Sequence, residues 1–236
     1  MFTKQSLITL FENSGIALSD EQFSRLDSYA EQLVSYNQKV NLTALTSPED
    51  IAEKHFLDSI LPFCHFKIKS GARLIDVGTG AGFPSCPLKI LRDDIKITLL
   101  DSLSKRVNFL TLISDKLGLC AECVHARAEE LGRDTGYRER YDIAVARAVA
   151  GLPVLCEYCL PFVRVGGYFL SLKGSRGEQE AKEAYTAIKT LGGRLEEVFR
   201  YSLPSGDERT LVVVRKISQT PPKYPRNKGQ MTKKPL

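Results

Sequence analysis

The chain has 236 residues, of which 43% are hydrophobic and 26% are charged, a composition typical of one globular domain with a small appendage. Collagen-like, mucin-like and coiled-coil proteins are excluded, and six cysteines are too few for a disulfide framework in a chain of this length. No apolar run approaches the roughly 18 residues of a membrane span, and residues 1–13 lack the features of a signal peptide. We therefore expect a cytoplasmic protein with reduced thiols and no membrane partner.

The net charge of +5 is concentrated at the C-terminus. Residues 217–236 contain five basic residues and no acidic one, so the rest of the chain carries 28 basic and 28 acidic side chains. The five are Lys223, Arg226, Lys228, Lys233 and Lys234. Because four prolines and a glycine in this segment disfavour helix and central strand, we expect residues 218–236 to form an extended arm over or beyond the body of the protein. Such an arm suits a polyanion, and a solvated terminus that binds nothing is the alternative.

Residues 1–65 are predicted to be helical. After a Ser19 cap, apolar residues recur at helical spacing from Phe23 onwards, and Ser47-Pro48 begins a second amphipathic helix that Pro62 ends. We expect this helical segment to pack on the rest of the chain.

Between residues 66 and 217, short apolar runs alternate with helical stretches. Strands are predicted at 73–78, 96–101, 121–125, 141–146, 167–172, 195–201 and 210–216. Helices are predicted at 83–92, 104–117, 152–163 and 177–191. This alternation predicts an α/β core with a doubly wound, mostly parallel, seven-stranded sheet. The turn at 205–207, Ser-Gly-Asp, predicts a closing hairpin that makes one strand antiparallel.

A glycine-rich turn follows the first predicted strand. In the segment Asp76-Val77-Gly78-Thr79-Gly80-Ala81-Gly82-Phe83-Pro84 the glycines are spaced by two, whereas the dinucleotide-binding fingerprint has its third glycine five residues after the first. With an acidic residue two positions before the first glycine, this spacing resembles the first motif of the Rossmann-like S-adenosylmethionine-dependent methyltransferases. A turn without Cβ atoms would let the backbone lie against the ligand. A tight turn that binds nothing is the alternative.

Two further strand ends are consistent with such a cofactor. Asp101 ends the second strand. Its spacing from Gly78 in the sequence is close to that of the acid that accepts hydrogen bonds from both ribose hydroxyls in this fold. Asp101 could also cap the following helix. Arg127-Ala128-Glu129 follows the third strand, where this fold places a loop over the adenine. Glu129 could instead be an acid that merely begins a helix.

The end of the fourth strand narrows the choice of methyl acceptor. Residues 143–148 lack the Asn/Asp-Pro-Pro-aromatic turn used for methylation of amino groups and the cysteine nucleophile required at a pyrimidine carbon. An acceptor with a free lone pair remains. Guanine N7 fits, because it carries no proton and its methylation needs placement and desolvation but no general base.

Taken together, the motifs resemble almost end to end those of the bacterial 16S ribosomal RNA guanine-N7 methyltransferase family, RsmG, also called GidB. The residues that carry the resemblance are Tyr36-Asn37, Asn41-Leu42-Thr43, His55-Phe56-Leu57-Asp58-Ser59, Asp76 to Pro84, Asp101, Lys105-Arg106, Arg127-Ala128-Glu129, Asp142, Arg147-Ala148-Val149, Lys173-Gly174, Thr220 to Arg226, Gly229 and Lys234-Pro235. The chain departs from the family at Tyr36 and at Ser85-Cys86, positions that affect local packing only.

The resemblance implies transfer of a methyl group from S-adenosylmethionine to N7 of one guanine of 16S rRNA near the decoding centre, on rRNA or the small ribosomal subunit. It implies cofactor contacts from Gly78, Gly80, Phe83, Asp101, Ser102, Leu103, Ala128, Glu129 and Arg147. Candidate phosphate contacts, each with a solvated surface role as the alternative, are Lys105, Arg106, Lys173, Lys223 and Arg226. The alternative functions are methylation of another RNA base, nicotinamide-dependent dehydrogenation and RNA binding without catalysis.

Other polar residues have competing interpretations. His55, Asp58 and Ser59 share a helix face, and we interpret them as a structural or RNA-facing cluster because attack by N7 leaves no proton to relay. Arg147, the one candidate catalytic residue, would hold the cofactor carboxylate or the substrate, where it could donate only to guanine O6.

The spacing of the cysteines suggests a metal site at first sight. Cys120 and Cys123, like Cys156 and Cys159, are separated by two residues, as in four-thiolate zinc sites. The first pair straddles the start of a strand and the second lies in an apolar helix, where small thiols pack well. We therefore expect no metal, and we expect the protein to act as a monomer.

Overall fold

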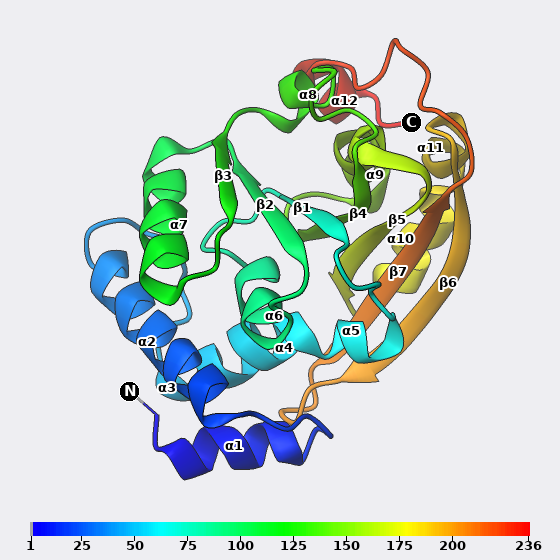
Figure 1. The fold of residues 1–236 in the computed structure, drawn as a ribbon. Helices are drawn as coiled ribbons and strands as arrows, with labels where there is room; N and C mark the ends of the chain where they lie inside the picture. The colour runs from blue at the N-terminus through cyan, green and yellow to red at the C-terminus, as the bar shows by residue number, and fades with distance from the viewer. Residues whose placement is uncertain (1) are drawn as a thin grey trace.

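A seven-stranded sheet organises the computed structural model, which describes residues 2–236 (Figure 1). Its strands are β1 (Arg73–Val77), β2 (Lys96–Asp101), β3 (Glu122–His125), β4 (Tyr141–Arg147), β5 (Val163–Gly174), β6 (Gly193–Ser202) and β7 (Glu208–Lys216). The order is β3-β2-β1-β4-β5-β7-β6, and β7 alone runs antiparallel to its neighbours. The predicted doubly wound sheet with one antiparallel strand is confirmed. Its central strands β1 and β4 are buried along most of their length because helices cover both faces.

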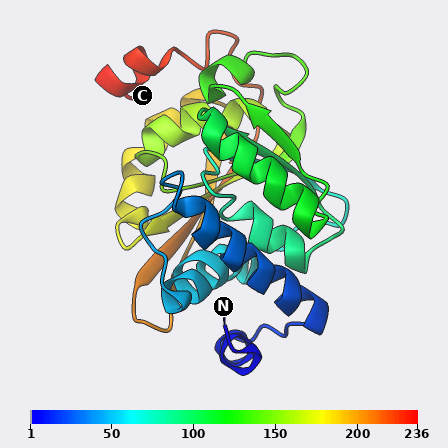
Figure 2. The same cartoon turned by 90° about the vertical axis from the view of Figure 1, so that its left-hand side faces the viewer.

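One face of the sheet is covered by α6 (Ser85–Leu91) and α7 (Ser104–Leu117), and α2 (Asp20–Asn37) packs against both helices (Figure 2). The Ser19 hydroxyl accepts from Gln22 N at the start of α2, in a capping box that fixes where this helix begins. A further helix, α1 (Lys4–Glu12), buries Leu7 and Phe11 in the same hydrophobic core. The N-terminal helices therefore extend one layer of the domain.

The other face is covered by α9 (Leu152–Cys159), the 3₁₀ turn η2 (Leu160–Phe162), α10 (Gly177–Glu183) and α11 (Tyr185–Thr190), while α8 (Ala128–Leu131) follows β3. Two predicted helices were too long. The helix expected at 152–163 ends at Cys159, ahead of Pro161, which has no N–H to donate. The helix expected at 177–191 is broken at Ala184, whose φ of −83° and ψ of 2° are not helical.

The segment after Ser47 is helical but irregular. It consists of α3 (Pro48–Asp50), the π-helix η1 (Ile51–Leu57), α4 (Asp58–Ile60) and α5 (Pro62–His65). Pro62 begins a further turn where the sequence predicted a stop, because proline is well tolerated in the first turn of a helix. π-Helical turns occur frequently at functional sites, and this one contains His55.

The C-terminal tail lies over the domain, one of the two expected placements, but the expectation that it is extended throughout was wrong because it ends in a helix. The prolines at 221, 222 and 225 lie ahead of α12 (Lys228–Lys233), so they do not prevent this helix, which Asn227 caps. The Met231 side chain is fully buried in the same core as α9 to α11. Across residues 2–236, no helix combines the length and the apolar character needed to cross a membrane.

Candidate active site

A cavity of about 560 Å³ opens at the carboxyl ends of β1, β2 and β3. Its lining includes Gly78 after β1, Asp101 and Ser102 at the end of β2, and Ala128 and Glu129 at the start of α8. Open α/β sheets bind ligands outside the carboxyl ends of their strands, in clefts of this size. The structure thus brings five of the predicted cofactor residues together. We call this space the first cavity.

Gly78 is required both by its backbone conformation and by its surroundings. Its φ is +73°, which side chains other than glycine rarely adopt, and its N–H donates to Leu100 O at 2.8 Å. A Cβ atom on Gly78 would lie 2.8 Å from Val149 Cγ2, in the loop that follows β4. The absence of a side chain therefore lets the turn after β1 and the loop after β4 form adjacent walls of the first cavity.

Asp101 connects the glycine turn with the start of α7. Its Oδ2 accepts from Gly80 N at 3.0 Å and lies 3.5 Å from Arg106 Nη1, while its Oδ1 accepts from Leu103 N at 2.9 Å. The alternative role as a cap of the following helix was wrong, because α7 has Leu103 at its N-cap and no side-chain cap hydrogen bond. Gly80 and Leu103 do not line the first cavity, but their amides orient the carboxylate that does.

Phe83 and Arg147, two further predicted cofactor residues, do not line the first cavity either. Phe83 is buried, with its ring stacked on His55 at 4.4 Å between centroids and the Arg147 guanidinium 5.1 Å from its ring centre. Arg147 Nη1 donates to Lys54 O at 3.1 Å and to Asp58 Oδ2 at 3.4 Å. Arg147 therefore faces the N-terminal segment.

A second cavity, of about 490 Å³, adjoins the first, and Ala148 lines both. Its charged lining comes from residues far apart in the chain, namely Lys54, Asp58, Arg147, Lys173, Glu180 and Arg209. Ala148 has a φ of +56°, a conformation that costs a residue with a Cβ atom about 1 kcal/mol or more. Strain of this kind is concentrated at functional sites, and here it lies where the two cavities meet.

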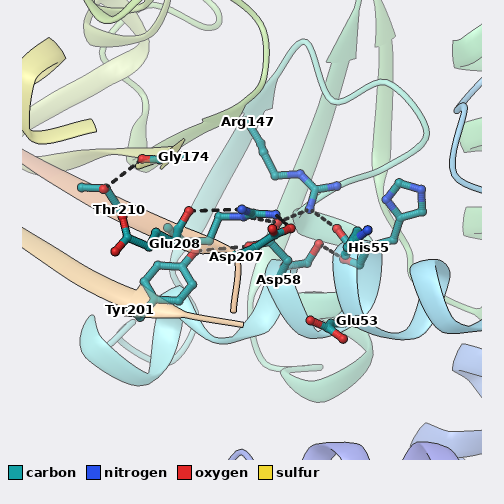
Figure 3. Close-up of polar contacts among 12 residues, drawn as sticks. Glu53, His55, Asp58, Arg147, Gly174, Tyr201, Asp207, Glu208 and Thr210 are labelled. Carbon is teal, nitrogen blue, oxygen red and sulfur yellow. Dashed lines mark hydrogen bonds and ion pairs between the residues drawn. The ribbon is translucent and has the colours of Figure 1, made fainter. Parts of the chain in front are cut away.

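Asp58 is the centre of the polar contacts beside the second cavity (Figure 3). Its Oδ2 accepts from Arg147 at 3.4 Å and from Arg209 Nε at 3.1 Å, and its Oδ1 accepts from the Tyr201 hydroxyl at 3.4 Å. Burial, together with the negative charge of Asp58, raises the pKa of Tyr201, which keeps the phenol protonated as a donor. These three partners, from β4, β6 and β7, tie α4 to the sheet.

His55 has a buried ring nitrogen without a hydrogen-bond partner, Nδ1, while its Nε2 lies 2.9 Å from Thr43 Oγ1. Burial, and then the positive charge of Arg147, lowers the pKa of His55 to about 4, so the imidazole is neutral at pH 7. Ser59 donates to the His55 carbonyl. His55, Asp58 and Ser59 therefore make separate structural contacts rather than one relay.

The five predicted phosphate contacts differ in accessibility. Lys105 and Lys223 are exposed, and Arg106 is half-buried against Asp101. Lys173 is half-buried and pairs with Glu180 at 2.8 Å, while Arg226 Nη2 lies 2.7 Å from Glu157 Oε2. Lys173 and Arg226 are therefore engaged with carboxylates, and a phosphate contact from either stays a prediction.

The paired cysteines lie in different surroundings. Cys156 and Cys159 are buried in α9, where desolvation raises the pKa of both thiols, while Cys120 is exposed. In the part of the chain that the structure describes, no three His, Cys, Asp or Glu side chains are grouped to hold a metal ion.

Three contributors to these sites carry no sequence signal that identifies them. Tyr29 of α2 reaches the glycine turn, although in the sequence it is one aromatic residue on an apolar stripe. Lys228 and Thr232 of α12 line the first cavity, and nothing in the sequence of the tail separates them from neighbouring polar residues. Each is placed by a contact between distant parts of the chain.

Comparisons with known proteins agree with this geometry. The O-methyltransferase of Bacillus cereus, solved in complex with SAH, shares the fold with a TM-score of 0.59 at 16% identity, over 90% of this chain and 99% of that one. Proteins named ribosomal RNA small subunit methyltransferase G are 48% identical in Clostridium botulinum, over 95% of both chains, and 50% identical in Acetivibrio thermocellus, over 94% of this chain and 92% of that one. The family model GidB, described as rRNA small subunit methyltransferase G, matches residues 22–212. The chain belongs to this family of small-subunit rRNA methyltransferases.

Proposed function

We propose that the protein transfers the methyl group of S-adenosylmethionine to N7 of one guanine of 16S rRNA near the decoding centre. The observation that carries this proposal is the junction of two cavities at Ala148, one lined by five of the predicted cofactor residues and the other by four cations and two carboxylates. The first would hold the cofactor and the second would receive the guanine nucleotide. Membership of the rRNA methyltransferase family supports RNA as the substrate.

The first cavity fits S-adenosylmethionine because its walls match the parts of that molecule. The backbone of Gly78, which lines the cavity without a side chain, can lie against the amino-acid end, and the Asp101 carboxylate has the acceptors that two ribose hydroxyls require. Ala128 and Glu129 are available for the adenine edge. The bound cofactor supplies an electrophilic methyl group on a sulfonium.

The groups around the second cavity suit an acceptor that loses no proton. Asp58 is engaged by Arg147, Arg209 and Tyr201. The neutral His55 contacts Thr43 through Nε2, and its unpartnered Nδ1 is buried and therefore not open to a substrate. A general base would need a free lone pair aimed at the substrate, whereas N7 attacks with its own. Arg147 can donate to guanine O6 and so turn N7 towards the methyl group.

In this proposal the protein accelerates transfer through proximity, orientation and the exclusion of water. Residues 1–65 supply Lys54 and Asp58 to the substrate side, residues 66–217 form the methyltransferase core, and residues 218–236 form the basic tail. The enzyme would act as a monomer in the cytoplasm, where its ribosomal substrate is assembled.

The test uses purified protein, S-adenosylmethionine labelled in its methyl group and small ribosomal subunits from cells that lack the activity. After digestion of the rRNA, mass spectrometry identifies the labelled nucleoside. Label in 7-methylguanosine at one site is the expected result. Label in another nucleoside would replace guanine N7 with a different RNA base. Cofactor binding without label on mature subunits, assembly intermediates or free rRNA would overturn the proposal.

A further inference from the structure

The C-terminal helix α12 forms part of the wall of the first cavity. Lys228 and Thr232, one helical turn apart, line it together with Asp101 and Glu129. In Figures 1 and 2, α12 and α8 lie at the same end of the molecule. A segment expected to meet only RNA therefore contributes side chains to the space that we assign to the cofactor.

An ion pair between Arg226 and Glu157 fixes α12 in this place. The guanidinium meets both carboxylate oxygens, with Nε 2.9 Å from Oε1 and Nη2 2.7 Å from Oε2. The Arg226 amide also donates to Oε1 at 2.6 Å. Glu157 is 1% exposed, and the next residue on α9, Tyr158, lines the first cavity. A bidentate ion pair between an arginine and a buried carboxylate has few alternative geometries. It therefore holds α12 against α9, the helix that carries another part of the cavity wall.

Two other arginines fix residues 220–225, the segment that leads to α12. Arg133, just beyond α8, donates to the Pro225 carbonyl at 2.6 Å. Arg138 donates to the Tyr224 carbonyl at 2.9 Å and to the Thr220 carbonyl at 2.7 Å. Because these bonds are made to backbone carbonyls, they hold residues 220–225 in place whatever side chains that segment carries. The position of α12 is therefore set from both α8 and α9, the two elements that border the same cavity.

Lys228 is the residue of this wall that has a free functional group. Within residues 2–236 its ammonium has no ion-pair or hydrogen-bond partner, whereas its carbonyl accepts from the Thr232 hydroxyl at 2.9 Å. Glu129 lies in the same lining and offers acceptors. An adenine edge presents both ring nitrogens that accept and an amino group that donates. A lysine and a glutamate together complement that edge.

We propose that α12 is a cofactor-binding element, in which Lys228 and Thr232 contact the adenosine half of S-adenosylmethionine. The inference rests on the proposed function, because it assigns the first cavity to that cofactor. It adds a binding role for the tail that does not depend on RNA.

The test measures binding by calorimetry with two probes, S-adenosylhomocysteine and 5′-methylthioadenosine, which lacks the amino-acid half. The variant is Lys228→Ala combined with Thr232→Ala, and the matched control is Lys233→Ala, which removes the same charge from an exposed position of α12 outside the cavity lining. We expect both probes to bind about three- to tenfold more weakly to the double variant, with an unchanged melting temperature without ligand, and unchanged binding to the control.

Affinities of the double variant within twofold of the wild type would overturn the inference. Equal weakening in the Lys233→Ala control would also overturn it, because the effect would then be one of net charge. Weakening for S-adenosylhomocysteine alone would contradict the assignment to the adenosine half. These measurements need no rRNA, so a wild type that binds the probes but methylates no rRNA would count against the proposed function only.

Discussion

Tyr29 holds the glycine turn through Ala81: its hydroxyl, fully buried in α2, donates to the Ala81 carbonyl. The same ring stacks on Phe83 with 5.5 Å between centroids, and Phe83 in turn stacks on His55. The N-terminal helices therefore position the loop that borders the first cavity, and they also contribute to the second. This contact ties α2 to the glycine turn of the core.

Replacing Tyr29 by Phe should weaken cofactor binding. The substitution leaves the buried Ala81 carbonyl without this donor, at a cost of about 1–3 kcal/mol, part of which the turn can relieve by moving. We expect the dissociation constant of S-adenosylhomocysteine to rise about three- to tenfold, with the rate at saturating cofactor within about twofold of the wild type. Calorimetry and steady-state methylation measure the two effects.

The control for Tyr29 is Tyr36→Phe in the same helix. The Tyr36 ring packs 5.0 Å from that of Phe109, away from the glycine turn. If both variants lose stability equally and keep the affinity of the wild type, Tyr29 contributes packing alone and does not position the turn.

Replacing Gly78 by Ala should prevent cofactor binding more strongly than the same change at Gly80. Both glycines have positive φ, +73° and +63°, so both variants carry similar backbone strain of about 1–2 kcal/mol. A new Cβ at Gly78 would lie 2.8 Å from Val149, whereas at Gly80 it would meet nothing within 4 Å. We expect at least a tenfold greater loss of S-adenosylhomocysteine affinity at Gly78, by calorimetry, with circular dichroism showing both proteins folded. Equal losses would assign the requirement for Gly78 to backbone strain alone.

The strand ends were predictable because local rules govern them. Apolar runs fix the strands, and the glycine turn and Asp101 follow two of these strands directly, so residues around the first cavity could be named from the sequence. Arg147 was placed correctly at the end of β4, but its side chain turns towards Lys54 and Asp58, which belong to a distant segment. The direction of that side chain depends on packing that no local pattern records.

The ion-pair partners of Lys173 and Arg226 also could not be predicted from local sequence patterns. Lys173 and Arg226 resemble surface residues in the sequence, because nothing distinguishes Glu180 and Glu157, their partners, from exposed acids. Glu157 is buried in α9 and Glu180 is half-buried in α10, so each pair joins two distant parts of the fold. The prolines of the tail suggested an extended chain, and the helix they precede depends on burial of Met231 against α9.

Stability should depend on pH through Asp76. This side chain is fully buried, with Oδ2 accepting from the Thr79 hydroxyl at 2.9 Å and Oδ1 without a partner. Burial raises its pKa to about 7 from 3.8. Because the folded protein holds this proton more tightly than the unfolded chain, the contribution of Asp76 to stability falls as pH rises from about 4 to 7.

The Asp76→Asn variant cannot ionise at this position, so it should gain stability relative to the wild type between pH 5 and pH 8, by on the order of 1–3 kcal/mol. Urea unfolding at several pH values measures the difference. His55, whose pKa is lowered to about 4, acts in the opposite direction over the same range, and its effect cancels in the comparison. The control is Asp20→Asn at an exposed position. A stability difference that is constant with pH would show that Asp76 does not titrate in this range.

Exposed cations near the cofactor end of α7 should contribute to rRNA binding. Lys105 lies in the first turn of α7, close to the carboxyl ends of the strands, whereas Lys116 lies in its last turn. Each phosphate contact changes the slope of log affinity against log salt by about 0.7–0.9. We therefore expect Lys105→Ala to weaken binding of small-subunit rRNA and to reduce that slope by the amount that corresponds to one phosphate contact. The control Lys116→Ala removes the same charge from the same helix and should leave the slope unchanged. Filter binding at four salt concentrations measures both slopes. If the two slopes are equal, net charge alone attracts the RNA, and Lys105 has no contact of its own.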